Sequence, residues 1–137
     1  MLATSKRRLV LILLAVCADQ LSKILVLKYY PSLASINHNG SFSMAWGVDY
    51  LYVSVISLLI FLVLIYFLER EISQKIGFAL IVSGGISNII DRVRLGGVVD
   101  FLHSPFWPTF NVADSFITIG AALIIIELII QQVRKAN

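Results

Sequence analysis

Four apolar stretches dominate this chain of 137 residues. They span residues 9–27, 51–68, 76–90 and 112–130, and each approaches the roughly 20 residues that a helix needs to cross about 30 Å of hydrocarbon. With 58% hydrophobic and 14% charged residues, a soluble domain of this size could not bury so much apolar surface. The sequence therefore predicts an all-α integral membrane protein, in which one domain over residues 1–137 contains four transmembrane helices.

The basic residues predict how these helices are oriented. Lys and Arg near the ends of membrane segments are retained on the cytoplasmic side, and seven of the eleven lie at the two termini and in the short connection 69–75. We therefore expect both termini to be cytoplasmic and the connections 28–50 and 92–111 to face outward, with room for a small β element and a short helix. The seven residues are Lys6, Arg7, Arg8, Arg70, Lys75, Arg134 and Lys135.

Several charged and amide side chains lie in or beside the apolar stretches, where an unpaired charge costs several kcal/mol. Asp19 and Lys23 are four residues apart and share a helix face, so an internal ion pair and a place in an active site both remain open. Asn88 and Arg92 have the same spacing, and a structural role is favoured for Arg92 and its neighbour Asp91. Most of these residues lie toward the outward ends of their segments, where they could converge.

A second set of polar residues opens the fourth segment. Asn111 and Asp114 have the spacing of a capping box, and the helix dipole favours a carboxylate in a first turn. On local evidence alone, capping is the better interpretation. Asp100 lies only a short connection upstream, however, and two acids within hydrogen-bonding distance would share one proton and separate their pKa values. That arrangement is typical of an aspartic peptidase.

Taken together and in order, these motifs resemble those of the bacterial lipoprotein signal peptidases, also called signal peptidase II, which are intramembrane aspartic peptidases of family A8. Two departures occur. Ser87 stands where the family usually has Gly, and Asn39 stands where it usually has Gly in the first outward connection; Ser is still small enough for close helix contact, and Asn tolerates a left-handed turn. The matching motifs are Asp-Gln-Leu-Ser-Lys at 19–23, Asn-His-Asn-Gly-Ser-Phe-Ser at 37–43, Gly-Gly-Ile-Ser-Asn-Ile-Ile-Asp-Arg at 84–92, Val-Val-Asp-Phe at 98–101 and Phe-Asn-Val-Ala-Asp-Ser at 110–115.

The resemblance implies an enzyme that removes the signal peptide from a prolipoprotein, cleaving before a cysteine that carries a diacylglyceryl group. It implies Asp100 and Asp114 as the catalytic pair, and we hypothesise that Asp114 is the more acidic member while Asp100 holds the shared proton. It further implies a monomer in the bacterial inner membrane, with its active site near the outer leaflet, membrane lipid and prolipoproteins as partners, and no nucleic acid, metal or cofactor. The supporting or substrate-binding residues that it implies are Asp19, Lys23, Asn37, Asn88, Arg92 and Asn111.

Two other interpretations remain open from the residues alone. A small transporter or proton-conducting protein also places Asp, Asn and Arg within helices. Alternatively, Cys17 follows basic residues and an apolar run, as in a lipoprotein precursor, although Val16 is large for the position before a cleavage site. His38 and His103 show no partner in the sequence, and we assign neither to catalysis.

Overall fold

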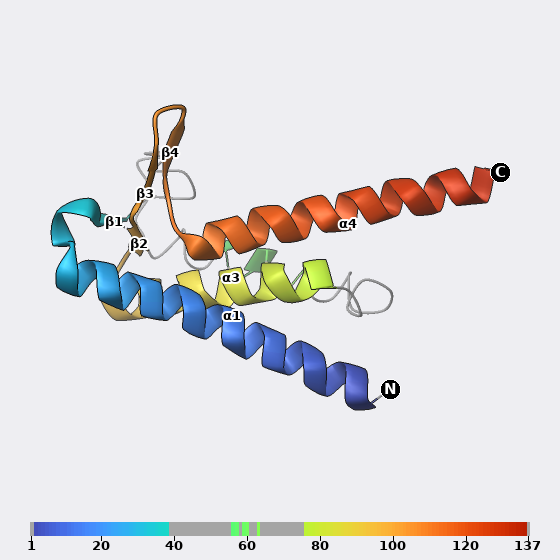
Figure 1. Cartoon of the computed structure of the whole chain (residues 1–137), viewed down its shortest axis with the longest axis horizontal. Coiled ribbons are helices and arrows are strands. Elements are labelled where there is room, and N and C mark those ends of the chain that lie inside the picture. The colour runs from blue at the N-terminus through green and yellow to red at the C-terminus, as the bar shows by residue number, and fades with distance from the viewer. Residues whose placement is uncertain (1, 39–55, 58, 61–62, 64–75, 137) are drawn as a thin grey trace.

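The described part of the protein is built on three long helices, which Figure 1 shows side by side. They are α1 (Leu2–Tyr29), α3 (Ile76–Leu95) and α4 (Val112–Ala136), and α3 contacts both of the others far more than they contact each other. The α1 and α3 helices run in one direction and α4 returns, so that both ends of the chain lie at the same end of the molecule. The computed structural model describes residues 2–38, 56–57, 59–60, 63 and 76–136.

Each of the three helices is long and apolar enough to cross a membrane. Their candidate spans are Lys6–Tyr29, Ile76–Leu95 and Val112–Lys135, so the expected mostly helical architecture is confirmed for the described residues. The helices cover the first, third and fourth expected segments and extend past them, because polar residues that find partners can continue a helix beyond its apolar part. Most of the expected segment 51–68 lies outside the described residues, so the helix expected there remains a prediction.

Short elements gather at the end of the helices that is remote from the termini. Pro31 follows α1 closely and disfavours helical backbone in the residue before it; a single 3₁₀ turn, η1 (Pro31–Leu33), leads into β1 (Ser35–Asn37). After α3, Gly96 has a φ of +72°, a conformation that glycine adopts without steric penalty, and the chain bends into β2 (Val98–Asp100). Gly96 therefore lies at the bend between α3 and β2.

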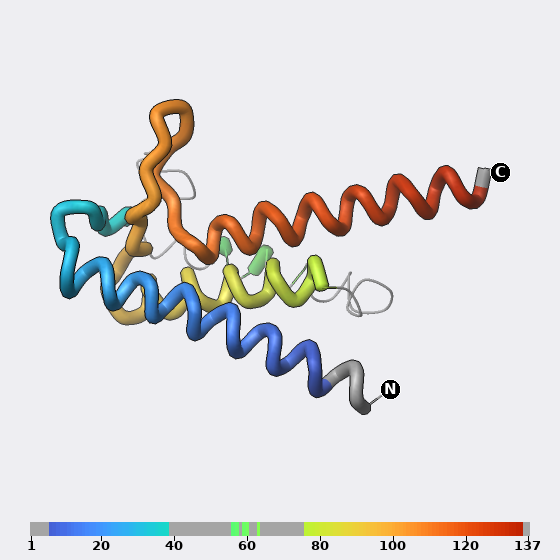
Figure 2. Tube along the Cα trace, in the orientation of Figure 1, coloured from blue at the N-terminus to red at the C-terminus, as the bar shows by residue number. Residues whose placement is uncertain are grey.

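Two small antiparallel sheets form there. The β1 strand pairs with β2, with Ser35 opposite Asp100 and Asn37 opposite Val98. The β3 (Leu102–Ser104) and β4 (Trp107–Phe110) strands form a hairpin, and Figure 2 shows this hairpin extending away from the helices. The β4 strand leads directly into α4, which places the hairpin beside the first turn of that helix.

The interior of the described residues is unusually polar. Large apolar side chains on α1 and α4 are mostly exposed, as expected for surfaces that face lipid, whereas charged and amide groups are buried where the three helices meet the strands. Buried groups of this kind require partners, and they indicate where the functional site lies. The buried polar residues are Asp19, Lys23, Ser83, Ser87, Asn88, Asp91, Asp100 and Asn111.

Candidate active site

Two carboxylates from different secondary-structure elements both accept hydrogen bonds from one asparagine. Asp100 ends β2, Asp114 lies in the first turn of α4, and Asn111 precedes that helix. The side-chain Nδ2 of Asn111 donates to Oδ1 of Asp100 at 2.8 Å, while its backbone N–H donates to Oδ2 of Asp114 at 3.2 Å. Asn111 therefore binds both acids at once.

The capping box predicted for α4 is present. Oδ1 of Asn111 accepts from the backbone N–H of Asp114 at 2.9 Å, and Asp114 returns the interaction to the backbone of Asn111. This reciprocal pair satisfies two donors at the start of the helix. Capping and proximity to Asp100 are consequently compatible, although the sequence presented them as alternatives.

Each acid also accepts a hydrogen bond from a second asparagine. Asn37 Nδ2 donates to Oδ2 of Asp100 at 3.0 Å, since the β1–β2 register places these residues diagonally on one face of the sheet. Asn88 Nδ2, from α3, donates to Oδ1 of Asp114 at 2.9 Å. The two carboxylates are thus held by amides from β1, α3 and the start of α4.

The environment of Asp100 favours its protonated form. Burial raises the pKa of Asp100 to about 6, and the negative charge of Asp114 also raises it, whereas the amides of Asn37 and Asn111 and the charge of Lys23 lower it. Asp100 is 2% exposed, so the loss of hydration dominates over the hydrogen bonds. A carboxyl with this pKa can hold a proton under conditions in which an ordinary aspartate is ionised.

Behind the two acids lies a buried ion cluster between α1 and α3. Lys23 Nζ lies 2.7 Å from Oδ2 of Asp19 and 2.8 Å from Oδ2 of Asp91. Asp19 Oδ1 accepts from the backbone N–H of Ala113 at 2.7 Å, so a side chain on α1 caps α4 directly before Asp114. The ion cluster therefore connects all three helices.

Ser87 and Gln20 complete this ion cluster. The hydroxyl of Ser87 donates to Oδ2 of Asp19 at 2.6 Å and accepts from Nε2 of Gln20 at 2.9 Å. The same Gln20 nitrogen lies 2.8 Å from Oδ1 of Asp91. The serine that departs from the family pattern thus gives Asp19 a buried hydrogen bond that glycine could not supply.

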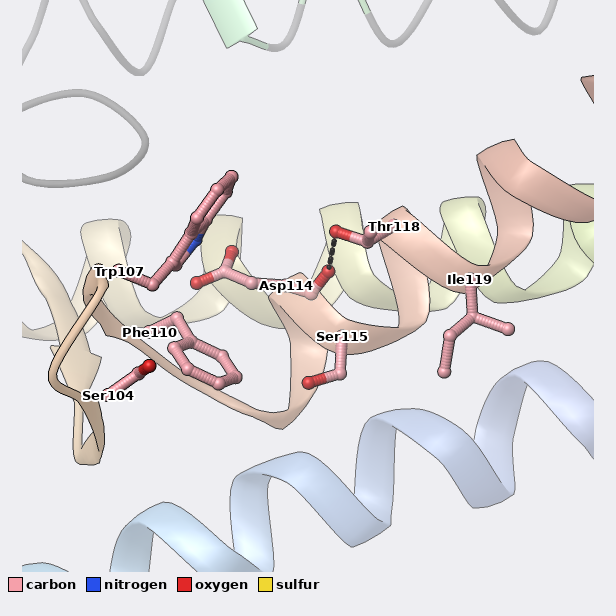
Figure 3. A pocket seen from close by; sticks show the side chains of 7 residues that line it. All are labelled: Ser104, Trp107, Phe110, Asp114, Ser115, Thr118 and Ile119. Carbon is pink, nitrogen blue, oxygen red and sulfur yellow. Dashed lines mark hydrogen bonds between the residues drawn. The ribbon is translucent and has the colours of Figure 1, made fainter.

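A pocket opens beside Asp114. Its volume is about 400 Å³, and Figure 3 shows the Asp114 carboxylate beside the indole of Trp107, with Phe110 close by. Asp114 is only half-buried, so its carboxylate is accessible from the pocket. Within the described residues, no group of three or more His, Cys, Asp or Glu side chains could hold a metal ion. The pocket is lined by Ser104, Trp107, Phe110, Asp114, Ser115, Thr118 and Ile119.

Comparison with known proteins gives this arrangement a family. The sequence profile described as signal peptidase (SPase) II matches residues 11–130. The chain belongs to the signal peptidase II family. The lipoprotein signal peptidase of Halothermothrix orenii is 34% identical over 134 residues, covering 87% of this chain and 92% of the relative. That of Streptococcus pyogenes serotype M5 is 36% identical over 143 residues, covering 90% and 93%.

Solved structures agree with the assignment. A bacterial membrane enzyme determined at 2.3 Å has a TM-score of 0.79 and 27% identity, covering 95% of this chain and 92% of its own. A second, at 1.9 Å, has a TM-score of 0.72 and 28% identity, covering 90% and 92%. This signal peptidase II is therefore a membrane-bound protease, and a transporter is not favoured.

The structure of this signal peptidase II brings most of the residues singled out from the sequence into one hydrogen-bonded network. Asp19 and Lys23 form the ion pair that their spacing suggested. Arg92, half-buried on α3, is close enough to both acids and to Asp91 for favourable charge interactions. His38 and His103, which were assigned no catalytic role, lie with Nδ1 3.0 Å from the backbone carbonyls of Gly96 and Phe101.

Three contributors to the network were missed or undervalued. Gln20 was noticed only as part of a motif, Ser87 only for its small size, and Asp91 only as a structural neighbour of Arg92. Their partners lie on other helices, more than 60 residues away along the chain. A local signal did exist for two of them, since Ser87 and Asp91 lie four apart, on the helix face that carries Asn88.

Proposed function

We propose that Asp100 and Asp114 are the catalytic pair of this signal peptidase II, and that Asn111 holds them in register. The observation that carries the proposal is the pair of hydrogen bonds from Asn111, one to each carboxylate. An aspartic peptidase needs two carboxyl groups that reach the same water and share a proton. Because Asn111 donates to both carboxylates, it holds them beside the same space, where that water would lie.

The reaction is hydrolysis of a peptide bond that releases the signal peptide from a prolipoprotein, as in the relatives that are named lipoprotein signal peptidases. The bond lies directly before a cysteine that carries a diacylglyceryl group. Acyl chains of that group belong in the hydrocarbon phase, and the exposed apolar faces of α1 and α4 offer such an environment beside the site.

The two acids differ in ways that suit different roles. Asp114 receives hydrogen bonds from Asn88 and from the backbone of Asn111 at the N-terminus of a helix, and its carboxylate lines the pocket, where an attacking water can reach it. It takes a proton from the attacking water. Asp100, whose pKa is raised to about 6, carries the resting proton and donates it toward the scissile carbonyl oxygen.

The second step restores the pair. The tetrahedral intermediate collapses as its C–N bond breaks, and the departing nitrogen takes a proton from Asp114 while Asp100 recovers one from the intermediate's hydroxyl. One water is consumed, and a carboxylic acid and an amine are released. Among the supporting residues, Asn37, Asn88 and Asn111 orient the carboxylates, and Arg92 contributes positive charge near both acids.

We further propose that the termini face the cytoplasm and the active site lies at the outer leaflet of the bacterial inner membrane. Both termini lie at one end of the helices and the strands at the other. The basic residues near the ends of the chain favour the cytoplasmic side for that end. In this orientation the β3–β4 hairpin and the pocket beside Asp114 meet the translocated part of the substrate. We also propose that the protein acts as a monomer and that residues 1–137 form a single peptidase domain.

Replacing each acid by its amide tests the catalytic pair. Asp100→Asn and Asp114→Asn should each abolish cleavage of a synthetic peptide containing a diacylglyceryl cysteine, because an amide cannot exchange the proton that the mechanism moves. Cleavage is measured by mass spectrometry on purified protein in detergent, with Lys28→Met on the exposed end of α1 as the control. Substantial turnover by either purified, folded variant would refute the proposal.

A further inference from the structure

The ammonium group of Lys23 uses its full hydrogen-bonding capacity inside the protein. It has three N–H donors and no acceptor, and it has three partners: Asp19 at 2.7 Å, Asp91 at 2.8 Å and Oδ1 of Asn88 at 3.1 Å. The side chain is 2% exposed. Its position is therefore fixed by α1 and α3 together, with no donor left for other groups.

The third of these bonds determines how the amide of Asn88 is turned. Oδ1 of Asn88 faces Lys23 and also accepts from Nδ2 of Asn111 at 3.2 Å, while Nδ2 of Asn88 donates to Asp114 at 2.9 Å. If the amide rotated by half a turn, its NH₂ would face an ammonium and its oxygen would face a carboxylate. Both contacts would be repulsive, so the donor is directed at Asp114.

Stability alone does not explain the ion cluster. Buried ion pairs lose so much hydration that well-packed apolar groups often stabilise a protein as well or better. Here the cluster ends on the atoms that hold the two acids: Lys23 reaches Asp114 through Asn88, and it reaches Asp100 through Asn88 and Asn111. This continuity indicates a role in the reaction.

We propose that Lys23 is a positioning residue for the catalytic pair, whose ammonium fixes the Asn88 amide so that its NH₂ group faces Asp114. The inference rests on the proposed function of Asp100 and Asp114. The new point is that the charge of Lys23 on α1 orients the donor to Asp114, although Lys23 itself does not touch the substrate. The positive charge also lowers the pKa of Asp100, so its loss should be visible in the pH dependence of the reaction.

The test must separate position from charge. Asp19, Asp91 and Lys23 together carry one net negative charge, and Lys23→Met/Asp91→Asn keeps that net charge because only Asp19 then remains charged. The wild type, which has the same net charge and retains Lys23 beside Asn88, is the reference for position, and Asp91→Asn alone measures the loss of the Asp91 carboxylate. Relative to both, we expect the double variant to lower kcat about tenfold to a hundredfold, the effect of losing a hydrogen bond to a charged group, with KM changed less than about twofold.

Lys23→Met alone adds the charge effect. Among the residues that the structure describes, the charged groups around Asp100 and Asp114 are Asp19 and Lys23 on α1 and Asp91 and Arg92 on α3. Without the cation, the pKa of Asp100 rises and the pair keeps its proton longer, so the alkaline limb of kcat/KM moves to higher pH. Lys28→Met, which removes an equal charge from the end of α1, should leave the limb in place.

An Asn88→Asp variant keeps the proposal testable if the Lys23 variants do not fold. It retains an acceptor for Lys23 but presents an oxygen in place of the NH₂ group, so kcat should again fall at least tenfold. Wild-type kcat in Asn88→Asp, or a double variant as active as Asp91→Asn, would overturn the role of Lys23. If the Lys23 tests fail in this way while Asp100→Asn and Asp114→Asn still lose activity, the proposed catalytic pair stands. Only the role of Lys23 is then rejected.

Discussion

At the scale of single residues, Asp114 serves the helix and the site at the same time. Its carboxylate closes a capping box with Asn111 and also accepts a hydrogen bond from the side-chain amide of Asn88. Because the cap fixes the side chain against its own backbone, the direction of the carboxylate is set by the start of α4. The direction of this carboxylate, which we propose to be catalytic, is therefore a property of local sequence, reinforced by one contact from another helix.

The proton on Asp100 can be tested through Asn37, whose amide lowers the pKa of Asp100. Asn37→Ala removes this donor and should raise that pKa above its present value of about 6. A carboxyl with a higher pKa keeps its proton to higher pH, so the alkaline limb of kcat/KM should move upward. The measurement is a pH–rate profile on the diacylglyceryl peptide.

Ser35 provides a matched control on the same strand. Its hydroxyl donates to the backbone oxygen of Asp100 at 3.3 Å and not to the carboxylate, so Ser35→Ala should leave the limb unchanged. A limb that moves to lower pH in Asn37→Ala would show that Asp100 is not the protonated member at rest.

At the scale of elements, α3 and α4 approach each other closely at glycines. A Cβ at Gly84 would lie 2.4 Å from the backbone oxygen of Ala113, and one at Gly120 would lie 2.5 Å from that of Gly77. These separations are possible only without side chains. The contact at Gly84 is next to Asp114, whereas the contact between Gly77 and Gly120 is about two turns away along α3.

Alanine at these glycines should separate stability from activity. Gly84→Ala and Gly120→Ala should each destabilise the protein by about 1–3 kcal/mol, the usual range for overpacking, and lower the Tm to a similar extent. Only Gly84→Ala displaces the start of α4, so its kcat should fall well beyond that of Gly120→Ala at a temperature where both are folded. Equal kcat values in the two variants would contradict a close coupling between this helix contact and the site.

The elements also show what the sequence can and cannot predict. The capping box of Asn111 and Asp114 and the Asp19–Lys23 pair depend on residues at most four apart, so spacing predicts them. The contacts of Lys23 with Asp91 and Asn88 depend on how α1 is rotated against α3. Local spacing carries no information about that rotation, and the family motifs indicated only that the residues belong to one site.

The ends of helices were predicted less well for a related reason. Hydropathy ended the third segment at residue 90, but α3 continues to Leu95. Asp91 pairs with Lys23 and accepts from the backbone N–H of Val99 at 3.2 Å, so its charge is satisfied within the helix. An apolar pattern identifies the part of a helix that faces lipid, whereas the polar turn that forms the site lies beyond it.

At the scale of the whole molecule, the separation of termini from strands predicts a specific pattern of chemical labelling. Phe106, at the tip of the β3–β4 hairpin, is 92% exposed, and Lys135 lies at the opposite end of the molecule on α4. In a Cys17→Ser background, which removes the single native cysteine, Phe106→Cys should react with a membrane-impermeant maleimide in spheroplasts. Lys135→Cys should react only in inverted vesicles.

Labelling of both positions from the same face would refute the proposed orientation without bearing on the proposed catalytic pair. Retained peptidase activity in each cysteine variant is the control for folding. The experiment also fixes the side of the membrane on which the pocket beside Asp114 opens, since the hairpin and this pocket share Ser104, Trp107 and Phe110.

The donors described for the two acids are all amides, from Asn37, Asn88 and Asn111 and from one peptide group. An amide neither gains nor loses a proton over the range in which proteins survive. A pH change that leaves the charges of Asp19, Lys23 and Asp91 in place can therefore alter how many protons the two acids hold while these amides keep their positions. Within that range, activity lost at an unfavourable pH should return when the sample is neutralised.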